Sequence, residues 1–176
     1  MPLLPHIRLL VPDGAPRVTA VSELPMTRAG LCWVAYVRLG ERMLGTIENA
    51  GTGETEFFAA DDDSVYTWAD FAAFAADCRR DGAPLDPEAV MELLVEEFDC
   101  ASIVRDVHGH AGTYARQTMD GRITGWAEVD QRPRTHDELM GVARQLSPRP
   151  AHGSGDVAWQ VWTGRIWRTL PIPDYD

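Results

Sequence analysis

The order in which helix-like and strand-like segments follow one another constrains the fold of this chain most strongly. Strand-like patterns occupy the first third and return beyond residue 112, whereas amphipathic helical spacing occupies the middle. The expected order is a meander of about three strands, two helices, a hairpin, a third helix and a last hairpin. Because strands and helices do not alternate regularly, we expect an α+β fold with antiparallel sheets and about three helices, rather than a doubly wound parallel sheet.

Turn residues separate the expected strands. Asp120-Gly121 is the strongest hairpin signal in the chain, and Thr163-Gly164 marks a second hairpin near the C-terminus. Gly40-Glu41 reads as a turn inside the N-terminal meander. The expected strands are Val18–Val21, Leu31–Leu39, Met43–Glu48, Glu56–Ala60, Thr113–Met119, Arg122–Val129, Val157–Trp162 and Arg165–Leu170.

Capping signals mark the start of each expected helix. Thr67 has Asp70 three residues later, Asp86 precedes a proline at the first helical position, and Thr135 has Glu138 three residues later. The first helix is expected to end near Asp81-Gly82. The residues expected to face the core are Trp68, Phe71, Phe74, Ala75 and Cys78 in the first helix, Met91, Leu94, Val95, Phe98 and Ala101 in the second, and Leu139, Val142, Ala143 and Leu146 in the third.

The length of 176 residues suits a single domain spanning residues 1–176. Two lobes are an alternative, because the segments before and after residues 107–112 differ in pattern. The first lobe would be an acidic β-meander plus helix pair over 1–106, and the second a hairpin–helix–hairpin over 107–176.

Negative charge is concentrated in one part of the chain. The formal net charge is −11, and residues 41–106 carry seventeen acids against four arginines, whereas the remaining residues are close to neutral. Such segregation predicts a surface field of one sign, which repels nucleic acid and attracts basic partners. Direct nucleic-acid binding is therefore not expected, although arginines and tryptophans alternate in the C-terminal third.

Four acids of the second helix fall on one face. At 100° per residue, Glu88, Glu92, Glu96 and Asp99 lie within an arc of about 80°, and the sequence holds no basic residue between 81 and 104. A solvated helix face explains this arrangement most simply. The functional alternative is a docking surface for a basic protein, which Asp61, Asp62 and Asp63 would extend.

Histidines supply the main alternative site. His108 and His110 are two residues apart, and Asp106 and His136 could complete a catalytic or metal-binding group. The spacing has no specific signature, and the three cysteines form no CxxC pair. We therefore expect no metal and no cofactor.

The first functional hypothesis is a small acidic interaction protein without catalytic activity, a regulator or inhibitor of the kind carried on mobile elements. Its expected partner is a basic protein, for example one that itself binds nucleic acid. The alternatives are a small enzyme using the histidine group, and a structural subunit of a homo-oligomer. Prolines interrupt the N-terminus and no apolar run reaches the length of a membrane span, so we expect a cytoplasmic protein without a membrane association.

Overall fold

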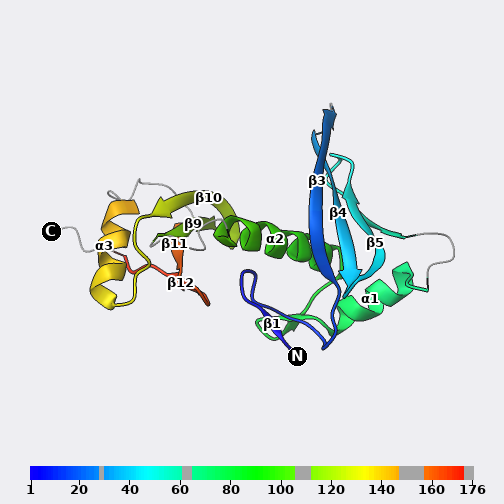
Figure 1. Ribbon diagram of the computed structural model, residues 1–176, viewed down its shortest axis with the longest axis horizontal. Helices are drawn as coiled ribbons and strands as arrows, with labels where there is room; N and C mark the ends of the chain where they lie inside the picture. Colours follow the sequence, from blue (N-terminus) through cyan, green and yellow to red (C-terminus); the bar gives the residue numbers. More distant parts are fainter. Residues whose placement is uncertain (28–29, 61–64, 106–111, 147–156, 173–176) are drawn as a thin grey trace. The chain divides into compact units, whose positions relative to one another are not determined.

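The computed structural model describes residues 1–27, 30–60, 65–105, 112–146 and 157–172. The chain divides into two compact units, Met1–Cys100 and Ala101–Asp176. The described residues form three helices and three antiparallel sheets (Figure 1), so the predicted α+β fold is confirmed.

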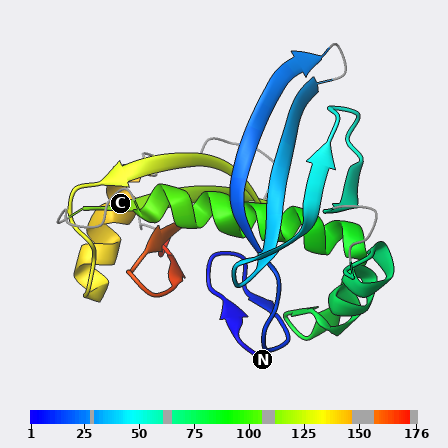
Figure 2. The same ribbon diagram turned by 45° about the vertical axis from the view of Figure 1, so that its right-hand side comes forward.

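The N-terminal unit is built around the predicted meander. Its sheet has the order β3-β4-β5-β6, with every neighbouring pair antiparallel. Strand β3 is much longer than the predicted Val18–Val21, because it pairs along nearly the whole of β4 with two shifts of register. Figures 1 and 2 show β3 and β4 projecting beyond β5. The strands are β3 (Arg17–Thr27), β4 (Gly30–Leu39), β5 (Arg42–Asn49) and β6 (Thr55–Ala59).

A second, smaller sheet in this unit was not predicted. Its four strands have only two residues each and follow the order β1-β2-β7-β8. The pairing of Arg79–Arg80 with the second of these strands ends α1 (Trp68–Asp77) earlier than predicted. The four strands are β1 (Leu3–Leu4), β2 (Leu9–Leu10), β7 (Arg79–Arg80) and β8 (Ala83–Pro84).

The core of the N-terminal unit lies between the strands and one face of each helix. Phe71 and Ala75 of α1 are fully buried, and so is Met91 of α2 (Pro87–Arg105). Trp68 was expected to face the same core, but 49% of its surface is exposed. The first residue of α1 therefore places a large aromatic ring at the surface.

The C-terminal unit combines both predicted hairpins in one sheet of order β10-β9-β11-β12. The turn between β9 and β10 has positive φ at Asp120 and Gly121, 51° and 79°, as the hairpin signal requires. The helix α3 (His136–Leu146) shares a core with this sheet through Leu139 and Val142. The last strand is shorter than predicted. The strands are β9 (Thr113–Met119), β10 (Arg122–Val129), β11 (Val157–Trp162) and β12 (Trp167–Thr169).

Candidate binding pocket and acidic surface

A pocket of about 480 Å³ opens in the N-terminal unit where three segments meet. Its walls come from strand β6, the start of α1 and the first turns of α2, and its volume lies in the range of ligand-binding pockets. The lining residues are Thr55, Glu56, Phe57, Phe58, Trp68, Asp86, Pro87, Glu88 and Met91.

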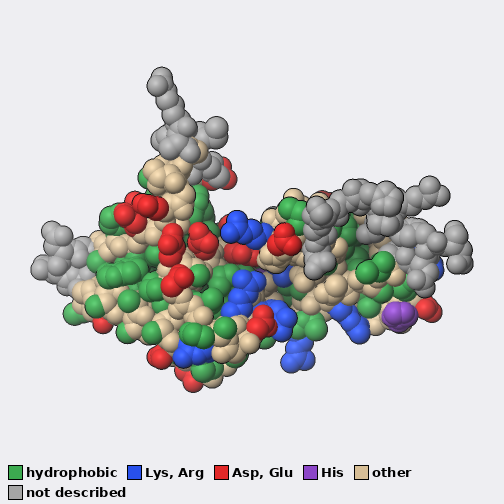
Figure 3. Space-filling model, turned by 180° about the vertical axis from the view of Figure 1, so that it is seen from behind, with side chains coloured by type: hydrophobic (Ala, Val, Ile, Leu, Met, Phe, Trp, Pro, Cys, Tyr) green, Lys and Arg blue, Asp and Glu red, His purple; other side chains and the backbone are tan. Residues whose placement is uncertain are grey.

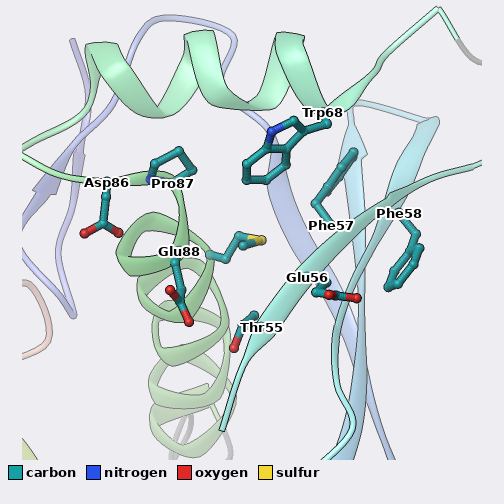
Figure 4. Close-up of a pocket in the computed structure, with 9 residues that line it drawn as sticks. Thr55, Glu56, Phe57, Phe58, Trp68, Asp86, Pro87 and Glu88 are labelled. Carbon is teal, nitrogen blue, oxygen red and sulfur yellow. The ribbon is translucent and has the colours of Figure 1, made fainter. Parts of the chain in front are cut away.

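Aromatic rings form the apolar part of this pocket. Figure 4 shows the Trp68 indole between Pro87 and Phe57, with Glu88 and Thr55 below it in this view. Trp68 stacks on Phe71 with ring centroids 6.1 Å apart, and Phe71 stacks on Phe57 at 5.0 Å. This aromatic stack fixes the position of the exposed indole.

Carboxylates form the charged part of the pocket. Asp86 caps α2, because its Oδ1 accepts a hydrogen bond of 2.7 Å from the backbone N–H of Ala89. Glu56 and Glu88 are exposed, and neither takes part in the ion pairs of the described residues, Met1–Asp13 and Arg8–Asp81. Among the described residues, the pocket lining contains no basic side chain.

The helix N-termini at this pocket are already capped. The backbone N–H of Thr67 donates to Asp70 Oδ2 at 2.7 Å, and the Thr67 hydroxyl accepts from the N–H of Asp70, which completes a capping box. The Thr67 hydroxyl also donates to Asp70 Oδ2 at 2.7 Å, and this bond together with the one from the Thr67 N–H holds the pKa of the Asp70 carboxyl below its ordinary value. Acidic caps therefore neutralise the partial positive charge that a free helix N-terminus would offer to an anion.

The four acids predicted to share a helix face all lie on α2. Glu88, Glu92 and Asp99 are exposed, and Glu96 is half-buried. We call Glu88, Glu92 and Asp99 the α2 acidic face. They span about 16 Å along the helix at 1.5 Å per residue. Figure 3 shows several acidic side chains gathered on the visible face of the N-terminal unit, with hydrophobic side chains between them. Asp61, Asp62 and Asp63 lie outside the described residues.

The α2 acidic face meets further negative charge from the sheet. Partial burial raises the pKa of Asp99 above its ordinary value, and the nearby carboxylate of Glu23 in β3 raises it further. Repulsion between these two carboxylates from different elements opposes folding at neutral pH.

One acid of α2 has a structural role that the sequence analysis missed. Glu97 is half-buried, and its Oε2 accepts hydrogen bonds from the backbone N–H groups of His6 and Ile7 at 3.0 and 3.1 Å. Burial lowers the pKa of Arg17, and the Glu97 carboxylate acts in the opposite direction. Glu97 therefore attaches the N-terminal loop to the helix. The sequence did offer a signal for this role, because Glu97 lies outside the arc of about 80° that contains the other four acids of the helix.

Most of the predicted histidine group lies outside the described residues. His136 is exposed at the first position of α3, whereas Asp106, His108 and His110 lie outside the described residues. In the part of the chain that the structure describes, no three histidine, cysteine, aspartate or glutamate side chains are placed to hold a metal ion.

One arginine of the C-terminal unit packs on a tryptophan ring. Arg116 is 6% exposed, lies 4.4 Å over the Trp167 ring, and donates a hydrogen bond of 2.8 Å from Nε to Gln160 Oε1. Trp162 is buried and lies 5.3 Å from Trp167, while Trp159 is half-buried against the core. The guanidinium and indole groups therefore stabilise the unit itself.

Comparison with protein-family models, with curated proteins and with solved structures finds no match to this chain. Among the described residues, none of the helices has the length and apolar character needed to cross a membrane.

Proposed function

We propose that this protein is a non-catalytic binding protein, an acidic regulator or inhibitor that docks a basic partner protein through the α2 acidic face. One observation carries the proposal: the exposed carboxylates of α2 take part in neither of the ion pairs of the described residues, while Glu88 lines the pocket together with Glu56, and the Glu23 carboxylate raises the pKa of Asp99. Like charges brought together reduce stability, and a basic partner would remove that cost on binding.

The partner class follows from the charge. A basic surface large enough to cover three carboxylates over about 16 Å is typical of proteins whose own ligand is nucleic acid. We therefore expect a nucleic-acid-binding protein as the partner, in a cytoplasmic setting. Exposed charges are screened beyond about 10 Å at 0.1 M salt, so the association should weaken as salt is added.

The test compares three baits in an extract of the native host. The face variant carries Glu88→Gln, Glu92→Gln and Asp99→Asn, and a matched control neutralises the same number of exposed acids elsewhere through Glu41→Gln, Asp120→Asn and Asp130→Asn. Proteins retained at about 50 mM salt and released at about 500 mM are quantified by mass spectrometry.

We expect the wild type and the control to retain the same basic protein, and the face variant to lose it. Equal recovery by the face variant would contradict the proposal, and so would a set of retained proteins without basic surfaces. Circular dichroism of all three baits checks that each is folded.

A further inference from the structure

We infer that the pocket beside Trp68 receives an arginine side chain of the basic partner, so that it anchors the docking proposed above. This inference rests on the proposed function and adds to it the residue type that is recognised. The occupant must match two properties of the site: an apolar, aromatic wall and an acidic rim whose described residues include no basic side chain.

The aromatic wall favours a flat cation. The Trp68 indole is 49% exposed, and the stack of Phe71 and Phe57 behind it fixes its orientation. Tryptophan is the best aromatic partner for a cation, and a guanidinium group can lie flat on its ring. Exposed apolar groups at the pocket, including Phe58 at 46% exposure, would also cover the methylene stem of such a side chain.

The acidic rim favours arginine over lysine. Glu56 and Glu88 come from different elements and both line the opening. A carboxylate can accept two parallel hydrogen bonds from a guanidinium, whereas the ammonium of lysine offers no such planar pair of donors. An anionic occupant is disfavoured, because Asp70 and Asp86 already occupy the N–H groups at the two helix starts.

The pocket and the α2 acidic face are continuous, since Glu88 belongs to both. The face extends about 16 Å from Glu88 to Asp99. An extended peptide of six residues spans about 20 Å and could therefore occupy both. A peptide of six residues is therefore long enough to test the pocket and the α2 acidic face together.

The experiment measures the affinity of the full chain for labelled hexa-arginine and hexa-lysine peptides by fluorescence anisotropy. The two peptides carry equal charge, so their affinity ratio isolates the contribution of the guanidinium group. The variants are Trp68→Ala and Trp68→Leu, where leucine keeps apolar packing against Phe71 without offering an aromatic face. Tyr36→Ala is the matched control, because Tyr36 is another exposed aromatic residue of the same unit that does not line the pocket.

We expect the wild type and Tyr36→Ala to prefer hexa-arginine, and both Trp68 variants to bind it about fivefold more weakly with a reduced preference over hexa-lysine. An unchanged ratio in the two Trp68 variants would overturn the arginine pocket. If the face variant still weakens both peptides, the proposed docking function survives that result. Absence of binding of either peptide to the wild type at low salt would overturn both proposals.

Discussion

At the scale of single residues, two acids of the same helix have opposite effects on stability. Glu97 satisfies backbone donors of the N-terminal loop and lies close enough to Arg17 to interact with its charge. Asp99 lies only two positions further along the chain, where its neighbour is the carboxylate of Glu23. The formal charge of an acid therefore does not determine its contribution to stability. The surrounding groups decide whether that contribution is favourable or unfavourable.

Glu97→Ala should lower the free energy of unfolding by about 2 kcal/mol. The substitution leaves two backbone N–H groups without their charged acceptor and removes the carboxylate beside Arg17. Denaturant unfolding measures the change, and Glu92→Ala, an exposed acid of the same helix, should stay within about 0.5 kcal/mol of the wild type. Equal values for the two variants would contradict the assigned role of Glu97.

Asp99→Asn should stabilise the protein at neutral pH. Because the folded-state pKa of Asp99 is raised, the folded state holds this proton more tightly than the unfolded chain does. Ionisation of Asp99 therefore lowers stability as the pH rises from the ordinary value of 3.8 through the raised value.

Thermal unfolding midpoints at several pH values measure this effect. The advantage of Asp99→Asn should shrink as the pH falls from the raised pKa toward 3.8, and it should be absent at lower pH, where Asp99 is protonated in both states. Glu92→Gln serves as the control. A lower midpoint for Asp99→Asn at pH 7 would show that Asp99 has a stabilising contact at neutral pH.

At the scale of the elements, helix starts are determined by short local signals. Both capping boxes form as predicted: Thr67 with Asp70 at α1, and Thr135 with Glu138 at α3, where Glu138 Oε2 accepts from the N–H of Thr135 at 2.9 Å. The hydroxyl and N–H of Thr67 hold the pKa of Asp70 below its ordinary value, and the backbone N–H groups of Arg134 and Thr135 do the same for Glu138. The stabilisation that these two carboxylates provide is therefore present at neutral pH. It is lost as the pH falls through their lowered pKa values.

Thr67→Ala should cost about 1 kcal/mol of stability, because α1 loses the side-chain acceptor at its first turn. The pKa of Asp70 should also rise toward its ordinary value, since the hydroxyl of Thr67 donates to it at 2.7 Å. Chemical denaturation and an NMR titration measure the two effects. Thr52→Ala, at an exposed loop position, is the control, and an unchanged Asp70 pKa in Thr67→Ala would contradict the capping assignment.

The sequence predicted the elements whose signals are local and missed those that depend on pairing across the chain. Helix starts, the Asp120-Gly121 hairpin and the meander follow from residues close in sequence. The two-residue strands β1, β2, β7 and β8 have no periodicity to detect, because long-range pairing alone defines them. The pocket was missed for the same reason, since its walls come from three separate segments. Trp68 has the helical spacing of a core residue, and only its place at the first turn of α1 leaves it exposed.

At the scale of the whole molecule, the charge is far from balanced. The net charge is −11, and the described ion pairs, Met1–Asp13 and Arg8–Asp81, lie on exposed side chains. Exposed pairs contribute little to stability, whereas a large net charge opposes the compact state through self-repulsion.

The thermal unfolding midpoint should therefore rise when sodium chloride is increased from about 10 mM to about 200 mM, because screening weakens the repulsion more than it weakens the few ion pairs. Scanning calorimetry measures the midpoint. The face variant, with three fewer negative charges, should show a smaller rise. A midpoint that falls with added salt would indicate that attractive pairs dominate the electrostatic energy.

The buried thiols have a consequence for the chemistry of this protein. Cys32, Cys78 and Cys100 are buried thiols outside any disulfide bond, and burial raises the pKa of Cys78 to about 11, so its nucleophilic thiolate is scarce at neutral pH. A thiol-specific reagent can reach each sulfur only when the surrounding structure opens. Strand β4, the C-cap of α1 and the last third of α2 therefore each contain a natural reporter of local opening, whose modification rate records how often that part of the structure unfolds locally.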